Sequence, residues 1–249
     1  MSEQLSRPSL FVAAIRSFAA AALSILCILV LGPPILLWVL ISRRPALLYQ
    51  VSVLVVRMAL ALAGVRYRVE GGEHIDRNRP CVYAVNHVSN IDPPVLFAAL
   101  RHVFPNLKIL YKAELRSLPV LVWCFDAAGF VPIERSRPEQ SMPAVDRAVD
   151  ALKAGSSFLI FPEGTRSRTG ELLPFKKGGL IMAIKAQVPV VPIAVCGTRD
   201  AWQRGSPIIR PVQVVLKVAP PVPTAGLTYD DRDVLIAKVR DAISARLEP

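Results

Sequence analysis

The sequence predicts an α/β fold in which a mixed sheet is flanked by helices and preceded by an apolar helical membrane anchor. Three observations support this prediction. No charged residue occurs between Ser17 and Ile41. After Val65, short apolar runs alternate with longer amphipathic ones, as in α/β domains. Hydrophobic residues make up 53% of the chain and the mean hydropathy is +0.42, which is high for a purely soluble protein. We therefore expect membrane-associated helices over residues 1–65 and an α/β domain over residues 66–249.

The uncharged segment 17–41 is long enough to cross a bilayer, but two prolines interrupt it. As one helix it would measure about 37 Å, against a hydrocarbon core of about 30 Å. Pro33 and Pro34 lie inside the segment, and an interior proline costs roughly 3 kcal/mol. A helix that ends before them covers Ser17–Leu31, which is too short to span a bilayer upright.

A second apolar segment, Pro45–Val65, contains Arg57 as its only charged residue. Two apolar helices around a proline turn could cross the membrane or dip into one leaflet, and the sequence leaves both arrangements open. A cleaved signal peptide is disfavoured because no small-residue cleavage site follows the first segment. We expect an anchor that is not cleaved.

The domain that follows is predicted to contain seven short apolar strands with helices between them. The predicted strands are Arg66–Glu70, Cys81–Val85, Lys108–Tyr111, Phe130–Ile133, Phe158–Phe161, Val190–Val195 and Val212–Val218. The predicted helices are Pro93–Leu100, Glu114–Cys124, Ser141–Lys153, Gly179–Lys185 and Asp230–Leu247. In the last of these, Leu235, Val239 and Ile243 recur every four residues, which places them on one helix face.

The composition narrows the classes of function. The 30 basic and 19 acidic residues give a net charge of +11, which suits an anionic bilayer surface or a phosphorylated substrate. Few aromatic residues and no basic helical stripe disfavour nucleic acid. The four cysteines are far apart and are expected to be buried free thiols. With three histidines and no His/Cys cluster, a zinc site is not expected.

The stretch "CVYAVNHVSNIDPPVLF" (81–97) places polar residues at the end of a predicted strand. Asp92 and two prolines fit a helix start, with Asp92 as the cap. If the chain turns back so that the His87 ring meets Asp92, the carboxylate fixes the tautomer and leaves the other nitrogen free to take a proton. Such a pair is a general base for a hydroxyl. Taken alone, these two residues favour the simpler interpretation, in which Asp92 only caps a helix and His87 is a polar loop residue.

A second stretch, "FLIFPEGTRSRTGELLPFKKGG" (158–179), fits a phosphate site and a solvated basic loop about equally when it is read alone. An apolar strand ends at Pro162, and four basic residues then outnumber two acidic ones among glycines that allow close backbone approach. A solvated basic loop is the alternative. The chain lacks GxxxxGK[ST], GxGxxG and GxSxG, so these nucleotide-binding loops and a serine-nucleophile hydrolase are unsupported.

Together these stretches resemble the motifs of the glycerolipid acyltransferase family. NHxSxxD is matched by Asn86, His87, Ser89 and Asp92, and FPEGTRS by residues 161–167. A further motif resembles Lys112, Glu114, Leu115, Pro119, Gly129, Val131, Ile133 and Arg135, and an apolar strand motif resembles residues 188–193. The motifs occur in the family's order over about residues 80–196. Val122 stands where the family commonly has glycine, so no acyl chain length is inferred.

The resemblance implies acyl transfer from a thioester to the free hydroxyl of 1-acylglycerol 3-phosphate, giving phosphatidate without an acyl-enzyme. The donor is acyl-CoA or acyl carrier protein, and no metal or bound cofactor is implied. His87 is the implied base and Asp92 its orienting partner. The implied substrate-binding residues are Lys112, Arg135, Glu163, Gly164, Thr165 and Arg166. Glu163 is expected to order the arginine rather than touch a phosphate that would repel it.

Other functions remain open from the sequence. The same motifs could acylate glycerol 3-phosphate or another lyso-lipid, and a non-catalytic protein that binds anionic lipid or a lipid hydrolase is the alternative class. By family analogy we expect the inner, cytoplasmic membrane with the site facing the cytoplasm. The oligomeric state is not predicted.

Overall fold

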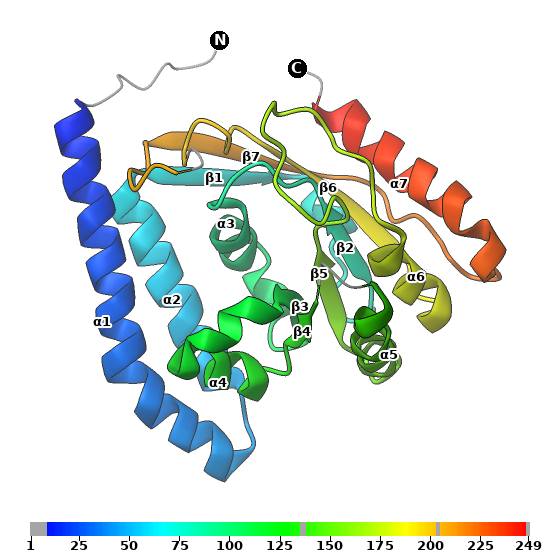
Figure 1. Cartoon of the computed structure of the whole chain (residues 1–249), viewed down its shortest axis with the longest axis horizontal. Helices are drawn as coiled ribbons and strands as arrows, with labels where there is room; N and C mark the ends of the chain where they lie inside the picture. The colour runs from blue at the N-terminus through cyan, green and yellow to red at the C-terminus, as the bar shows by residue number, and fades with distance from the viewer. Residues whose placement is uncertain (1–8, 135–137, 203–204, 248–249) are drawn as a thin grey trace.

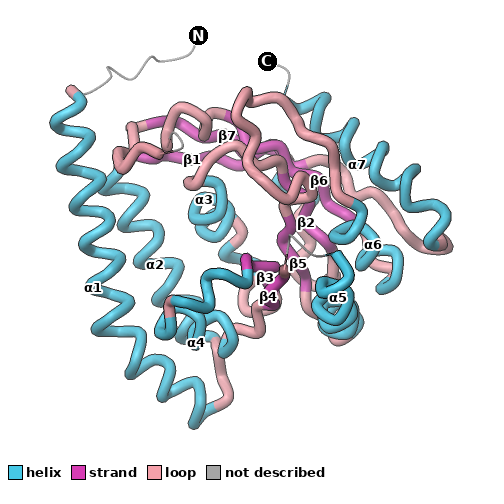
Figure 2. The backbone as a smooth tube through the Cα atoms, in the orientation of Figure 1, coloured by secondary structure: helices cyan, strands magenta, loops and turns pink. Residues whose placement is uncertain are grey.

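The computed structural model of the chain describes residues 9–134, 138–202 and 205–247. Figures 1 and 2 show a twisted sheet with helices on both faces and two long N-terminal helices along one side. This is the predicted mixed α/β architecture, with the apolar helices packed against the domain.

The sheet has seven strands in the order β1-β7-β6-β2-β5-β3-β4. Strands β2 to β6 run parallel to one another, whereas β7 pairs antiparallel with β6 and parallel with β1. Each strand overlaps a predicted one, and their bounds are β1 Val65–Glu70, β2 Val82–Val85, β3 Leu107–Lys112, β4 Val131–Ile133, β5 Ser157–Ile160, β6 Val190–Cys196 and β7 Val212–Val218.

The central strands are buried on both faces, which is why they read as continuous apolar runs. In β2, Tyr83 and Val85 pack in a core with α3 (Asp92–Ala99), while Val82 and Ala84 face a second core. Helices α5 (Pro138–Lys153), α6 (Lys177–Ala186) and α7 (Arg232–Leu247) cover that second face. The predicted stripe Leu235, Val239 and Ile243 is fully buried there.

Helix α1 (Leu10–Ser42) continues through Pro33 and Pro34, so of the two possibilities considered the uninterrupted helix is the one the structure has. Figure 1 shows it bending in its C-terminal part, as interior prolines cause. Packing against α4 (Pro119–Ala127) supports this segment: a Cβ at Gly32 would lie 3.2 Å from a Val120 methyl. Tertiary contact thus offsets the proline cost.

The chain reverses after α1 at Arg43, which adopts the left-handed conformation, and α2 (Ala46–Ala63) follows Pro45. The chain therefore reverses at the end of α1 and not at the prolines. Both helices are long and apolar enough to cross a membrane. They are also fastened to the structure, since Arg16 Nε donates to the Leu62 carbonyl and Ser17 Oγ accepts from the Ile209 amide.

The predicted helix Glu114–Cys124 is two elements instead of one. A 3-10 helix, η3, covers Ala113–Ser117, and α4 begins at Pro119. Leu118 between them has φ −107° and ψ 86°, because the proline ring disfavours the helical conformation of the preceding residue. The same proline then suits the first turn of α4.

The four cysteines are free, but Cys81 alone among them is fully buried and the other three are half-buried. The expectation of free thiols is confirmed, and that of complete burial holds for one residue.

Candidate active site

The predicted site residues that belong to the described part of the chain lie at one edge of the sheet. In parallel strands the carboxyl ends share an edge, which is where α/β proteins bind ligands. His87 follows the end of β2, Glu163 follows the end of β5, and Lys112 is the last residue of β3. Strand order therefore brings motifs together that are far apart in the sequence.

The pairing of β2 with β5 explains which loop residues meet. Val82 is aligned with Phe158, a separation of 76 residues. Beyond the strand ends, the His87 amide contacts the Glu163 carboxylate and the Arg166 guanidinium contacts Asn90, and both pairs are also 76 residues apart. The two loops thus continue the register of the strands that lead into them.

His87 and Asp92 form a buried pair. Nδ1 of His87 lies 2.8 Å from Oδ2 of Asp92, and the two residues are 9% and 0% exposed. The same carboxylate oxygen accepts from the amides of Val88 and Ser89, each at 2.8 Å. The chain does turn back as the sequence predicted, and the turn is held by the carboxylate itself.

Asp92 does not cap helix α3 through its side chain, contrary to expectation. The helix begins at Asp92 and its cap position is Ile91. The next two residues are prolines, which have no amide hydrogen to offer a capping carboxylate. The prolines therefore leave Asp92 available to His87 and the loop amides.

The His87 ring is stacked on Phe161, with centroids 4.1 Å apart and planes at 23°. Asn86 fixes the strand end, because its side-chain oxygen accepts from the Val195 amide at 2.7 Å and its amide donates to the Val195 carbonyl at 3.1 Å. The stacking on Phe161 and the hydrogen bond to Asp92 orient the imidazole, and Asn86 holds the backbone that carries it.

Glu163 supports the loop of His87. Its Oε1 accepts from the His87 amide at 2.6 Å, and its Oε2 accepts from the Leu173 amide at 2.9 Å. Burial raises the pKa of this carboxyl, against the opposing effect of these two hydrogen bonds. The expectation that Glu163 orders the arginine is not what the structure shows, since both of its oxygens hold backbone amides.

Arg166 is half-buried beside the same loop, and its Nη1 donates to the side-chain oxygen of Asn90. Thr165 is exposed next to it. Gly164 has φ +69°, a left-handed conformation that favours glycine, and Lys176 packs over this turn, since a Cβ there would lie 2.8 Å from Lys176 Cδ. A guanidinium and an ammonium group thus flank the turn.

The remaining predicted residues are less closely placed. Lys112 is exposed at the end of β3 and pairs with Glu114 at 2.8 Å. Arg135 lies outside the described residues, just after β4 (Val131–Ile133).

Sequence reasoning missed Asn90 and Phe161 as neighbours of the site. Both lie inside the motifs that were recognised, and the β2–β5 register would have paired Asn90 with Arg166. Ser89 was recognised by its motif, and its hydroxyl donates to the Trp202 carbonyl at 3.1 Å, a contact with no signal in the sequence.

A family model described as Acyltransferase matches residues 66–196, which include every site residue described above. The chain belongs to the acyltransferase family. The motif resemblance is thereby confirmed, and the fold agrees with it.

The chain is similar to named members of this family. The 1-acyl-sn-glycerol-3-phosphate acyltransferase of Limnanthes douglasii is 32% identical over 185 residues, covering 74% of this chain and 64% of the relative. The alpha form of that enzyme from Homo sapiens is 32% identical over 193 residues, covering 73% and 64%. The chain thus spans a little under two thirds of these relatives.

A solved family structure matches nearly the whole fold. It is the 1-acyl-sn-glycerophosphate (LPA) acyltransferase PlsC from Thermotoga maritima, with a TM-score of 0.77, 27% identity and 94% coverage of each chain. The match includes most of the N-terminal helical region, because 94% of this chain is aligned.

Proposed function

We propose that the chain transfers an acyl group from a thioester to the free hydroxyl of 1-acylglycerol 3-phosphate, producing phosphatidate. The observation that carries the proposal is the buried His87–Asp92 pair, 2.8 Å apart, in a family whose named relatives act on this substrate. Asp92 occupies Nδ1, so Nε2 of the imidazole is the nitrogen available to an acceptor hydroxyl.

The proposed reaction needs no acyl-enzyme. Nε2 of His87 removes the hydroxyl proton as the acceptor oxygen attacks the thioester carbonyl carbon. The C–O bond forms, the C–S bond breaks, and the thiolate leaves with the proton returned by the imidazolium. Asp92 stabilises the imidazolium while it exists. The donor is acyl-CoA or acyl carrier protein, and the residues proposed for the acceptor phosphate are Arg166 with Lys112, Arg135 and Thr165.

The substrate is tested by offering three acceptors in parallel to the detergent-solubilised protein: lysophosphatidate, glycerol 3-phosphate and lysophosphatidylcholine. Labelled acyl-CoA is the first donor and acyl carrier protein the second. We expect label in phosphatidate. Equal or faster transfer to another acceptor would overturn the substrate, and release of free fatty acid without an acceptor would indicate a hydrolase.

The phosphate role of Arg166 predicts a selective change in KM. Arg166→Ala should raise the KM for lysophosphatidate about 10- to 100-fold, because charge-assisted hydrogen bonds are worth about 1.5–3 kcal/mol. Asn90→Ala, which keeps the guanidinium but removes its orienting oxygen, should raise KM about 2- to 10-fold. Initial rates at varied acceptor concentration check both, and an unchanged KM in Arg166→Ala would contradict the assignment.

We also propose that the chain is anchored in the inner, cytoplasmic membrane with its site facing the cytoplasm. The two apolar helices support the anchor, and a thioester donor supports the cytoplasmic side. A cysteine introduced by Thr169→Cys, at an exposed position beside the basic loop, should react with an impermeant maleimide in inverted vesicles but not in intact spheroplasts. The wild-type chain supplies the background of its native cysteines, and the reverse pattern would place the site outside.

A further inference from the structure

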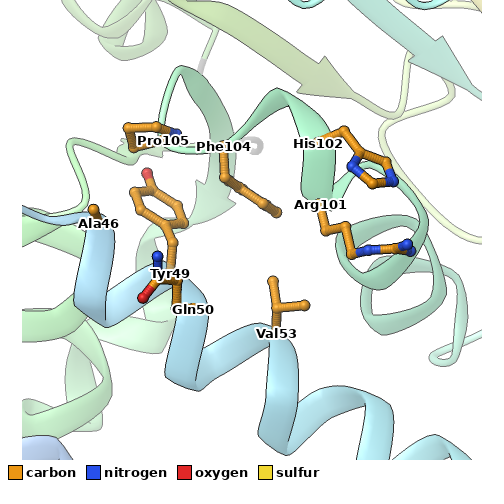
Figure 3. A pocket seen from close by; sticks show the side chains of 8 residues that line it. All are labelled: Ala46, Tyr49, Gln50, Val53, Arg101, His102, Phe104 and Pro105. Carbon is orange, nitrogen blue, oxygen red and sulfur yellow. The ribbon is translucent and has the colours of Figure 1, made fainter.

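A cavity of about 390 Å³ lies between helix α2 and the segment that leads into β3. Figure 3 shows side chains from α2 on one wall and from residues 101–105 on the other. The α2 wall is formed by Ala46, Tyr49, Gln50 and Val53, and the facing wall by Arg101, His102, Phe104 and Pro105. Its volume lies within the range of about 300–1,000 Å³ typical of ligand sites.

The cavity has an aromatic interior. Tyr49 is buried and stacks on Phe104 with ring centroids 4.6 Å apart. The Tyr49 hydroxyl donates to the Ala128 carbonyl at 2.9 Å, so its polar end is satisfied away from the cavity. The half-buried side chains of Phe104 and Val53 therefore offer apolar surface to an occupant, and the Tyr49 ring packs behind Phe104.

The rim of the cavity carries positive charge at Arg101. Arg101 and His102 are exposed, and no acidic side chain occurs among the described residues that line the cavity. The pKa of His102 is lowered by desolvation and by the charges of Arg101 and Arg77, which places Arg77 in the same positive field. Arg57, the only charged residue of α2, lies one turn beyond Val53 on the same stripe.

This cavity is separate from the candidate active site. It adjoins the amino end of β3, whereas His87 and Arg166 lie at the carboxyl edge of the sheet. A strand of six residues separates the two edges by about 20 Å. The neighbouring outward face of α2 is apolar, with Leu54 and Met58 exposed, as suits a helix that contacts acyl chains.

We propose that this cavity holds an anionic phospholipid of the surrounding bilayer, with its phosphate at Arg101 and an acyl chain along the aromatic wall and Val53. The occupant is inferred from the juxtaposition of a basic rim, an apolar interior and an apolar helix face beside it. The lipid would fix the start of α2 against the domain. The proposal rests on membrane association and is independent of the identity of the acyl acceptor.

Lipid retention in native mass spectrometry tests the site without any acyl transfer. The full chain in detergent is titrated with palmitoyl-oleoyl phosphatidylglycerol or with the matching phosphatidylcholine, and we expect preferential retention of phosphatidylglycerol. Val53→Trp fills the cavity without changing charge, and Leu54→Trp places the same bulk on the outward face. Arg101→Gln removes one rim charge, and Lys238→Gln removes one from α7.

The apparent Kd for phosphatidylglycerol should rise about tenfold in both Arg101→Gln and Val53→Trp. The first variant loses one charged hydrogen bond to the phosphate, and the second loses the space for the acyl chain. The Kd should change less than twofold in Leu54→Trp and Lys238→Gln. Thermal unfolding checks that each variant is folded. If Val53→Trp does not fold, the proposal is judged on Arg101→Gln. The proposal would be overturned if Arg101→Gln and Lys238→Gln changed the affinity for phosphatidylglycerol equally, or if free CoA displaced the lipid.

Discussion

Replacement of His87 by alanine is expected to lower acyl transfer by about 10²- to 10⁴-fold, the usual contribution of a positioned general base. The fold should survive, because the contacts that hold this loop use the backbone of His87. Its amide donates to Glu163, and its carbonyl accepts from the Ser167 amide at 2.8 Å. Alanine keeps both backbone hydrogen bonds and loses the ring with its contacts to Asp92 and Phe161, while the Asp92 carboxylate still accepts from the amides of Val88 and Ser89.

The measurement is kcat for lysophosphatidate acylation, with the thermal midpoint recorded for each protein. His74→Ala is the matched control, since it removes a histidine in the short helix η1 (Gly72–His74), away from the sheet edge. We expect wild-type turnover from His74→Ala. A His87→Ala protein that retains most of its kcat would remove the base assignment.

The strands could be predicted because buried strands have a recognisable pattern of apolar residues. A central parallel strand is apolar on both faces, so four consecutive buried residues such as Val82–Val85 form a continuous run. The long N-terminal helix could not be predicted in the same way. Its continuation past Pro33 and Pro34 depends on packing against α4. Helix propensity describes single residues and does not include that tertiary contact.

In the site, too, contacts between residues close in the sequence could be predicted, whereas contacts that depend on tertiary structure could not. His87 and Asp92 are local in the sequence, and the two prolines give a physical reason for their contact. Glu163 was assigned to the wrong partner. It binds the backbone amides of His87 and Leu173, and because every residue except proline has such an amide, the side-chain types in the sequence do not reveal this contact. Its position follows only from the pairing of β2 with β5.

That register has a consequence for how the site works. Two contacts between the loops after β2 and β5 join residues that are 76 positions apart in the sequence, as in the pairing of the strands themselves. The positions of the proposed base and of the proposed phosphate-binding arginine therefore both depend on this one pair of strands. Glu163 joins the loops through the His87 backbone, and Asn90 joins them through Arg166. A shift between the strands would therefore displace both groups together.

Asp92→Asn is expected to lower kcat by about 10²- to 10⁴-fold while leaving most of the loop intact. Three donors surround Oδ2 of Asp92: the His87 ring and the amides of Val88 and Ser89. The asparagine oxygen should occupy this position, because its NH₂ group would face other donors there. Tautomer and geometry are then retained, but the negative charge that stabilises the imidazolium is gone.

Asp92→Ala separates this electrostatic role from the structural one. It removes the acceptor of two loop amides, each worth about 1.5–3 kcal/mol when the partner is charged, so its thermal midpoint should fall well below that of Asp92→Asn. In Asp92→Asn the NH₂ group enters the position of Oδ1, which is buried with no hydrogen-bond partner among the described residues, at a cost of about 1–3 kcal/mol. If Asp92→Asn kept near wild-type kcat with a lowered midpoint, Asp92 would be a loop-stabilising residue alone; a large loss of kcat in a folded Asp92→Asn protein requires its charge at the imidazole.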